Sequence, residues 1–262
     1  MSVEELFSAL SDENVFVLLN SGNRGDGLIH MGGRALLEKC GVSYQEIEFG
    51  REVSGQTLLV YGCGGFCVPY HHNVQRTRFY TQRFDKIYIL PSSFDLSCDE
   101  VRRFIAELPK KIIVYCRERY SFEQVRQFAP YKENIFLDHD LAFYVNYSQY
   151  KRPGTGTLIA FRRDSESIVP LNIKRKLSFL KLRRNKDVSK GPATEGESLL
   201  SLVAKYREIF TDRAHVAIAA AMLGKETYLF PNSYHKVKGI YEYSLSGFRN
   251  VHWMGEAHKE NP

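Results

Sequence analysis

The chain has 262 residues, 44% of them hydrophobic and 25% charged, and its formal net charge is +6 at pH 7. This length and composition are typical of a globular protein with one large domain or two small ones. They exclude a protein that spans a membrane, because the longest apolar runs, such as residues 216–223, are much shorter than a membrane span.

The start of the chain and its cysteines indicate the compartment. Residues 1–12 are acidic and lack the basic start of a secretory signal. The five cysteines are odd in number and scattered, which favours free thiols in a reducing compartment. Cys63 and Cys67 have C-x3-C spacing without a second ligand pair, and His71 and His72 are expected in an exposed loop. We therefore expect a cytoplasmic protein and no metal site.

The first 145 residues alternate between patterns typical of strands and of helices. The expected strands are residues 15–20, 44–49, 57–61, 86–90, 111–116 and 134–137. The expected helices are residues 28–40, 98–108 and 121–128. Pro91 is expected to end the fourth strand. Short apolar strands separated by helices predict a parallel sheet with helices on both faces, which is an α/β fold.

Residues 146–156 are rich in turn-forming residues and are interpreted as a linker. Strands are then expected at residues 157–162, 208–210 and 227–230, and helices at residues 197–206 and 216–223. We therefore predict two domains, residues 1–148 and a smaller one at residues 149–262. The last residues of the chain are expected to pack back on the first domain.

The turn at residues 211–215, Thr-Asp-Arg-Ala-His, is the strongest functional signal in the chain. It places an arginine and a histidine where a strand leads into a helix, and helix N-termini attract anions. Thr211 is expected to be the N-cap of this helix. The turn thus predicts a site for an anionic substrate that undergoes acid–base chemistry. In the alternative interpretation, Arg213 pairs with Asp212 or Glu208 and His215 is only a packed helix residue.

Polar or glycine-rich segments follow most of the other predicted strands as well. They are residues 20–26, 62–65, 92–93, 117–118 and 162–163. Ligands of doubly wound sheets bind outside the carboxyl ends of the strands. A cleft between two such domains would gather these groups from both sides.

Residues 174–190 contain eight basic residues and a single acidic residue, Asp187, with leucine and isoleucine interleaved. We consider three interpretations, in order of preference. The first is a solvated or substrate-facing basic surface, the second is a surface that contacts anionic lipid, and the third is a nucleic-acid patch. No nucleic-acid partner is expected, because no nucleic-acid module accompanies the stretch.

Several motifs, in order and spacing, resemble the polysaccharide pyruvyl transferase family across nearly the whole chain. The matching segments are Asn23-Arg-Gly-Asp26, Gly62-Cys-Gly-Gly65, Ile89-Leu-Pro-Ser-Ser-Phe94, Arg117-Glu118 with Ser121, Arg162 with Asp164 and Glu166, Thr211-x-Arg213-x-His215, and residues 232–239. The resemblance implies two Rossmann-like domains that face each other across a cleft, similar to GT-B glycosyltransferases. It also implies transfer of a pyruvyl group from phosphoenolpyruvate, as co-substrate, to sugar hydroxyls as a cyclic ketal.

The resemblance divides the candidate residues between donor and acceptor. Phosphoenolpyruvate carries a phosphate and a carboxylate, and arginine binds both groups through its planar fork. The candidate donor-binding residues, in the second domain, are Arg213, Arg162, Thr211, Ala214 and Lys236. The candidate catalytic residues are His215 and Asp26. The candidate acceptor-binding residues are Asn23, Gly64, Gly65 and Glu118. For Arg162 the alternative is an ion pair with Asp164 or Glu166, and for Asn23 and Asp26 it is a turn or N-cap role.

The leading hypothesis from the sequence is thus a metal-independent pyruvyl transferase that needs no cofactor and acts on a saccharide acceptor. A further hypothesis makes the acceptor lipid-linked and places residues 174–190 against the inner face of the membrane. The first alternative is a GT-B-like glycosyltransferase that uses a nucleotide-sugar. The second alternative is a non-catalytic protein that binds glycans or anions.

Overall fold

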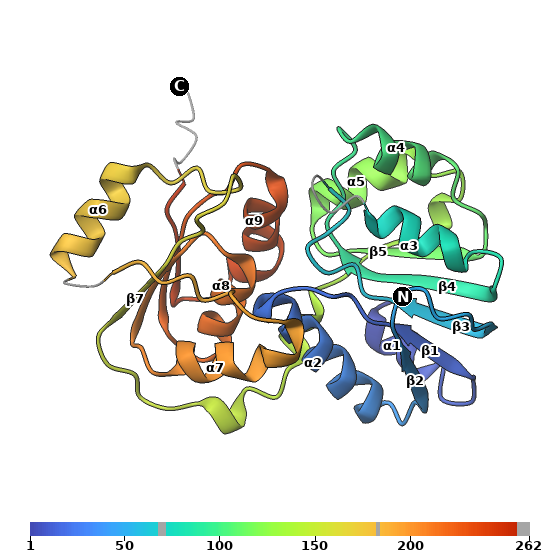
Figure 1. The fold of residues 1–262 in the computed structure, drawn as a ribbon, viewed down its shortest axis with the longest axis horizontal. Helices are drawn as coiled ribbons and strands as arrows, with labels where there is room; N and C mark the ends of the chain where they lie inside the picture. Colours follow the sequence, from blue (N-terminus) through green and yellow to red (C-terminus); the bar gives the residue numbers. More distant parts are fainter. Residues whose placement is uncertain (68–71, 182–183, 256–262) are drawn as a thin grey trace. The chain divides into compact units, whose positions relative to one another are not determined.

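The computed structural model describes residues 1–67, 72–181 and 184–255. Its contacts divide the chain into two compact units (Figure 1). The first unit contains Met1–Gly22 and Asp26–Val145, and the second contains Asn23–Gly25 and the chain from Asn146 onward. The sequence alone places the segment Asn23–Gly25 in the first domain, whereas its contacts group it with the second unit.

The first unit contains a six-stranded parallel sheet in the order β2-β1-β3-β4-β5-β6. Its strands are β1 (Val15–Leu18), β2 (Tyr44–Ile47), β3 (Gly55–Val60), β4 (Phe84–Ser92), β5 (Ile112–Cys116) and β6 (Ile135–Leu137). Its helices are α1 (Val3–Ser8), α2 (Arg24–Lys39), α3 (His72–Tyr80), α4 (Asp99–Ala106) and α5 (Arg119–Phe128). The order of the strands reverses between β1 and β3.

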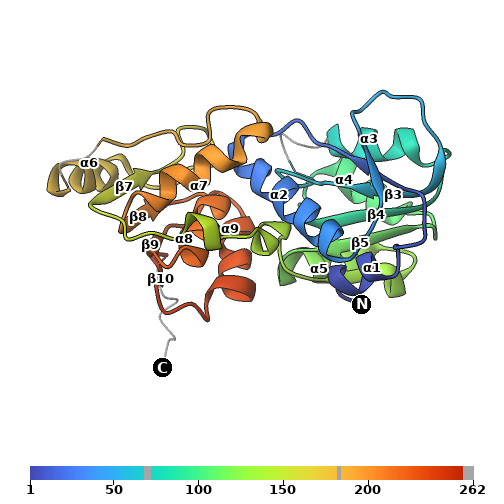
Figure 2. The same ribbon diagram turned by 90° about the horizontal axis from the view of Figure 1, so that it is seen from below.

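Helices cover both faces of this sheet, as the sequence predicts (Figure 1 and Figure 2). Successive strand side chains point to opposite faces. Val15 and Val17 therefore pack with the apolar side chains of α1 and α2. Phe16 and Leu18 pack with those of α3, α4 and α5. All four residues of β1 are buried, which explains its continuous apolar sequence.

Two predictions for the first unit are wrong in detail. Pro91 does not end its strand, because β4 continues through it to Ser92. The pairing with β5 shifts register between Ile89 and Ser92, and such an irregularity accommodates a residue that has no N–H to donate. His72 is the first residue of α3 and not part of a loop, although it is exposed. His71 lies outside the described residues.

The second unit contains a four-stranded parallel sheet in the order β10-β9-β8-β7. Its strands are β7 (Thr157–Ala160), β8 (Glu208–Thr211), β9 (Glu226–Leu229) and β10 (Val251–Trp253). Its helices are α6 (Leu171–Leu180), α7 (Gly196–Ala204), α8 (Ala214–Met222) and α9 (His235–Ile240). The sequence analysis missed α6, α9 and β10. Helix α8 is apolar nearly all round and buried, since it packs against α7 and the sheet.

The protein is therefore an α/β protein with two parallel sheets, consistent with two Rossmann-like domains. The GT-B-like arrangement across a cleft stays a prediction. The expectation that the last residues pack back on the first domain stays a prediction, and residues 256–262 lie outside the described part of the chain. Among the described residues, no helix combines the length and hydrophobicity that a membrane span requires.

Candidate functional site

The turn between β8 and α8 is held by the side chain of Thr211. Its hydroxyl donates to the carbonyl of Ala160 at 3.0 Å and accepts from the N–H of Arg213 at 3.1 Å. The expectation that Thr211 caps the helix is wrong, because Arg213 occupies the N-cap and its side chain makes no capping bond. Thr211 is fully buried and ties the end of β8 to β7, which holds Arg213 in position.

Arg213 is only 7% exposed. Its Nη2 atom pairs with Oδ1 of Asp187 at 2.9 Å, whereas its buried Nε–H has no acceptor among the described residues. Burial lowers the pKa of Arg213, and the nearby charge of Arg162 lowers it further. A buried donor without an acceptor is costly, so an oxygen atom that accepted from this Nε–H would stabilise the site.

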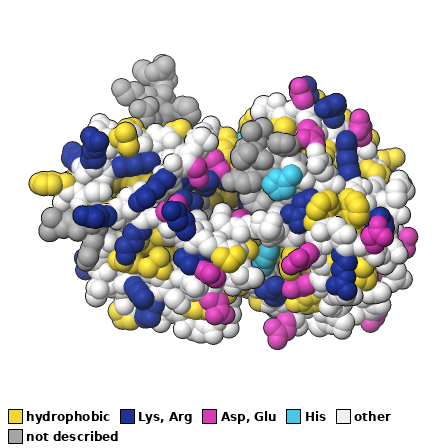
Figure 3. Space-filling view, viewed as in Figure 1, with side chains coloured by type: hydrophobic (Ala, Val, Ile, Leu, Met, Phe, Trp, Pro, Cys, Tyr) yellow, Lys and Arg dark blue, Asp and Glu magenta, His cyan; other side chains and the backbone are white. Residues whose placement is uncertain are grey.

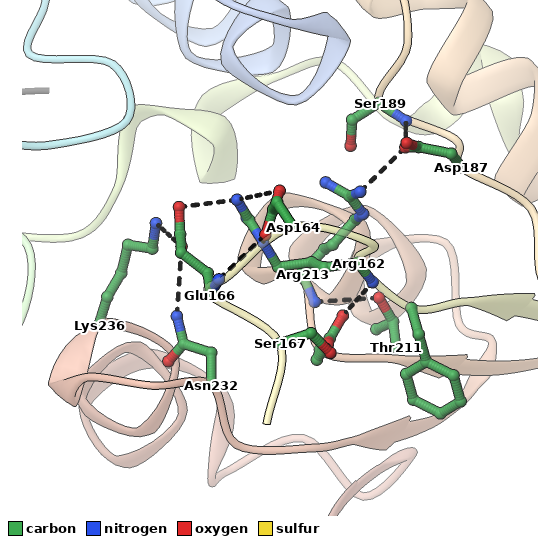
Figure 4. A network of polar contacts seen from close by, with 12 residues as sticks. Arg162, Asp164, Glu166, Ser167, Asp187, Ser189, Thr211, Arg213, Asn232 and Lys236 are labelled. Atoms are coloured by element: carbon green, nitrogen blue, oxygen red, sulfur yellow. Dashed lines mark hydrogen bonds and ion pairs between the residues drawn. The ribbon is translucent and has the colours of Figure 1, made fainter. Parts of the chain in front are cut away.

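Arg162 stands at the end of β7 within a network of ion pairs (Figure 4). Its Nε and Nη2 atoms contact the two oxygens of Asp164 at 2.8 and 2.9 Å, and Nη2 also contacts Glu166 at 2.7 Å. Burial would raise the pKa of Asp164, but the hydrogen bond and charge of Arg162 outweigh this effect and lower it. Arg162 thus forms the ion pairs that the alternative interpretation expected, and donor binding by Arg162 stays a prediction.

Lys236 enters the same network from α9. Its Nζ atom lies 3.1 Å from Oε2 of Glu166, and both side chains are more than nine-tenths buried. The Nδ2 atom of Asn232 lies 3.5 Å from the same carboxylate oxygen. The network therefore brings together three of the predicted donor residues, Arg162, Arg213 and Lys236, from three different elements (Figure 4).

His215 lies in the first turn of α8, directly after the buried Ala214. The segment Asn23–Gly25 passes against it, and a Cβ atom at Gly25 would lie 3.0 Å from Nδ1 of His215 and 3.0 Å from Oδ1 of Asn23. A side chain at position 25 would press against both groups, so glycine allows this close approach. The amide N–H of Gly25 donates to Oδ1 of Asn23 at 2.8 Å. The predicted residues Asn23 and His215 are thus neighbours.

Asp26 and the loop of residues 62–65 meet within the first unit. Oδ1 of Asp26 accepts from the N–H of Gly64 at 3.0 Å. Gly64 and Gly65 have φ values of +68° and +105°, which favour glycine. This loop follows β3, where the strand order reverses, and such a switch point is where ligands of doubly wound sheets bind. Asp26 and the two glycines therefore occupy a position suited to a ligand.

Comparison with known proteins identifies the family of this chain. The family model for polysaccharide pyruvyl transferase matches residues 23–234. The chain belongs to the polysaccharide pyruvyl transferase family. The fold is also similar to the crystal structure of an uncharacterized protein from Klebsiella pneumoniae subsp. pneumoniae NTUH-K2044, with 26% identity, a TM-score of 0.76 and 97% of each chain covered. No curated protein matches this chain.

Family membership implies an enzyme whose acceptor is a polysaccharide. Within residues 1–67, 72–181 and 184–255, no group of three or more His, Cys, Asp or Glu residues is placed to hold a metal ion. Independence from a metal ion stays a prediction.

Glu118 has a structural position in this protein. Its Oε2 atom accepts from the N–H of Ser121 at 2.9 Å and so caps α5, and the Ser121 hydroxyl also bonds to the carboxylate. The side chain is fully buried. A capping carboxylate with no exposed surface can shape a neighbouring loop, but acceptor binding by Glu118 stays a prediction.

Two residues that hold the candidate site in place, Asp187 and Asn73, are absent from the sequence-based site. Asp187 forms an ion pair with Arg213. The sequence could have indicated a role for Asp187, because it is the only acidic residue in the basic stretch 174–190. Asn73 donates to the carbonyls of Gly62 and Gly65 at 3.2 and 2.8 Å and holds their loop, which no motif indicated. Such partners are far apart in sequence, so local patterns do not reveal them.

His30 of α2 predicts a dependence of stability on pH. Burial first, and then the charge of Arg34, lower the pKa of His30 from 6.5 to about 4. Between these values the unfolded chain binds more protons, so the free energy of unfolding should fall as pH falls from 6.5 to 4. The full loss is about 3 kcal/mol. Urea denaturation of wild type and His30→Gln at pH 7 and pH 4.5 measures it.

The loss for the His30→Gln variant should be smaller than for wild type, because glutamine does not titrate. The two proteins share all other titrating groups, so their difference isolates His30. Equal losses for both proteins would show that His30 does not carry this effect.

Proposed function

We propose that this protein transfers the pyruvyl unit of phosphoenolpyruvate to two hydroxyls of a saccharide and forms a cyclic ketal. The observation that carries the proposal is the buried Nε–H of Arg213 at the start of α8, which has no acceptor within the described part of the chain. Phosphate and carboxylate oxygens suit such a donor, and helix N-termini add N–H groups aimed at the same anion. His215 follows two residues later on the same helix.

The reaction requires two proton movements that balance. One sugar hydroxyl adds to the central carbon of the enol while the methylene carbon gains a proton and becomes a methyl group. The second hydroxyl then displaces phosphate from the same carbon, and its proton leaves with the phosphate. His215 is proposed to move the proton at the methylene carbon, since histidine exchanges protons near neutral pH.

The donor residues take different parts in this proposal. Arg213 binds the anion directly, with the backbone at Ala214 beside it. Arg162 and Lys236 supply positive charge, and their carboxylate partners hold them in place. The hydroxyl of the buried Thr211 accepts from the backbone N–H of Arg213 and so positions this arginine beside the donor.

The acceptor residues are proposed to be Asp26, Asn23, Gly64, Gly65 and Glu118. Asp26 would accept a proton from a sugar hydroxyl or orient it, as carboxylates near substrates commonly do. The two glycines would let the backbone approach the sugar. We propose that the acceptor is a cell-surface polysaccharide or its lipid-linked precursor.

Phosphate release is the direct test of the proposed function. The protein is incubated with phosphoenolpyruvate and either a galactoside or N-acetylmannosamine, with and without EDTA. We expect release of inorganic phosphate that depends on the acceptor and is unaffected by EDTA. Stabilisation by nucleoside diphosphates with no phosphate release would instead indicate a glycosyltransferase. Binding of glycans without turnover would indicate a non-catalytic protein.

The role of Arg213 is tested separately by thermal shift. Phosphoenolpyruvate should raise the melting temperature of wild type but not of Arg213→Lys. The lysine keeps a cation beside Asp187 but lacks the planar fork of arginine. Equal shifts for both proteins would show that the guanidinium does not bind the donor.

A further inference from the structure

Helix α6 of the second unit lies on the surface and turns one side outward to solvent. None of its ten residues is buried. Leu171, Phe179 and Leu180 are 69%, 78% and 61% exposed, and Ile168, three residues before the helix, is 53% exposed. Several large apolar side chains on one short segment need a partner, because contiguous apolar patches on soluble proteins mark interaction sites.

The inward side of α6 attaches it to its own sheet. Leu177 packs on the apolar cluster around Phe161 and Phe210. Lys174 donates to the Ser167 hydroxyl at 2.8 Å, and Lys181 pairs with Glu208 at 2.9 Å. These contacts engage the lysines on the inward side of α6 and leave the outward side to solvent.

Basic side chains accompany the exposed apolar ones. Arg175 and Lys176 lie on the outward side of α6, and Arg184 beyond it is also exposed. Figure 3 shows Lys and Arg side chains gathered on this face of the second unit, with hydrophobic side chains among them. Arg183 of the same basic stretch lies outside the described residues. A mixed basic and apolar surface suits an anionic apolar partner better than a neutral one.

A pocket of about 640 Å³ opens beside the same helix. Arg162, Arg163, Lys174 and Arg175 contribute positive charge to its lining, and Asp164 contributes the one acidic side chain. Arg162 is also one of the proposed donor residues, so the pocket borders that site. Leu171 and Val169 add apolar surface. The pocket is therefore suited to a phosphate group that carries an apolar tail.

We propose that the α6 surface, defined as Ile168, Leu171, Arg175, Lys176, Phe179 and Leu180, docks on a membrane that contains anionic phospholipids. Amphipathic helices with basic and large apolar side chains lie in the membrane interface, where the apolar groups insert among the lipids. The basic groups are attracted to the anionic headgroups, and a headgroup phosphate occupies the pocket. This inference goes beyond the proposed function and does not depend on the reaction.

Co-sedimentation with lipid vesicles tests the inference on the full chain without any substrate. Wild type should sediment with vesicles of phosphatidylcholine that contain phosphatidylglycerol, and much less with phosphatidylcholine alone. Binding should weaken as salt is raised, because salt screens exposed charges. Free glycerol phosphate should not displace the protein from vesicles, since the apolar side chains of the α6 surface also hold it.

Two variants separate the apolar part from the basic part. Phe179→Ser with Leu180→Ser should weaken binding at least about tenfold, because two exposed apolar groups no longer insert. Arg175→Gln with Lys176→Gln should weaken binding to anionic vesicles about 30-fold. The matched control is Phe128→Ser with Arg126→Gln, which changes an exposed aromatic and a basic residue on α5 of the first unit. This control should bind like wild type.

Four results would overturn the proposal. Wild type could stay in the supernatant with anionic vesicles at low salt, or the α5 control could lose as much binding as the α6 variants. Light scattering could also show that wild type is a dimer and that the variant Phe179→Ser with Leu180→Ser is a monomer. The surface would then contact a second copy of the chain. Binding of a nucleic acid in place of vesicles, lost in the Arg175→Gln and Lys176→Gln variant, would assign the surface to that partner.

Discussion

Replacement of His215 by alanine should lower kcat for phosphate release by about 10²–10⁴-fold, which is the usual contribution of one acid–base group. The imidazole lies at the first turn of α8, beside Asn23 and Gly25, and close to the buried arginine in the same turn. No other histidine is part of this turn. Steady-state kinetics with phosphoenolpyruvate and a saccharide acceptor measure the effect.

The control for this variant is His252→Ala in the same unit. His252 pairs with Glu226 on the surface, far along the chain from the turn, and 44% of its side chain is exposed. That variant should retain wild-type kcat. The two variants should share the wild-type melting temperature within a few degrees. If His215→Ala keeps full turnover while it remains folded, the proton must be moved by another group.

The Asp140→Asn variant should lose about 3–5 kcal/mol of unfolding free energy, because removal of one charge from a buried ion pair leaves the other without compensation. Asp140 Oδ2 lies 2.8 Å from Nη1 of Arg117, and both side chains are only 1% exposed. Arg117 also donates to the Ser93 hydroxyl at 2.9 Å. The asparagine oxygen can still accept from the N–H of Ala142, as Oδ1 of Asp140 does, so the local turn is preserved. Urea denaturation at pH 7 measures the loss.

An exposed ion pair in the same unit provides the matched control. Glu107 and Arg78 lie 2.8 Å apart, with side chains 66% and 48% exposed. Glu107→Gln should change the free energy of unfolding by less than about 1 kcal/mol, because solvent screens such pairs. If Asp140→Asn also lost less than about 1 kcal/mol, other groups would have to stabilise the charge of Arg117.

The strands of this protein could be predicted well from its sequence. Continuous apolar runs such as Val15–Leu18 arise because both faces of a parallel sheet are covered by helices. Each residue of such a strand must therefore be apolar, and this pattern can be recognised in the local sequence. The strand at Pro91 was predicted too short, because tolerance of a proline depends on the register of the neighbouring strand. The helix that begins at His72 was missed because its sequence is largely polar and only its packing against the sheet shows it.

The site was predictable where its residues are close in sequence. The turn from Thr211 to His215 could be found because a strand end, a helix start and the functional side chains adjoin along the chain. The partners of these side chains could not be found in this way. Asp187, not Asp212 or Glu208, pairs with Arg213, and the choice depends on how the segment after α6 passes over the turn.

The sequence by itself determined the α/β class, the parallel strands and the family of this protein, because each depends on local periodicity or on short motifs in a given order. Only the tertiary structure decided which charges meet, that Thr211 supports the turn without capping α8, and that α6 turns its apolar side chains outward. Those outcomes depend on contacts between segments distant along the chain, and the free energy of such contacts is defined only when the segments are packed together.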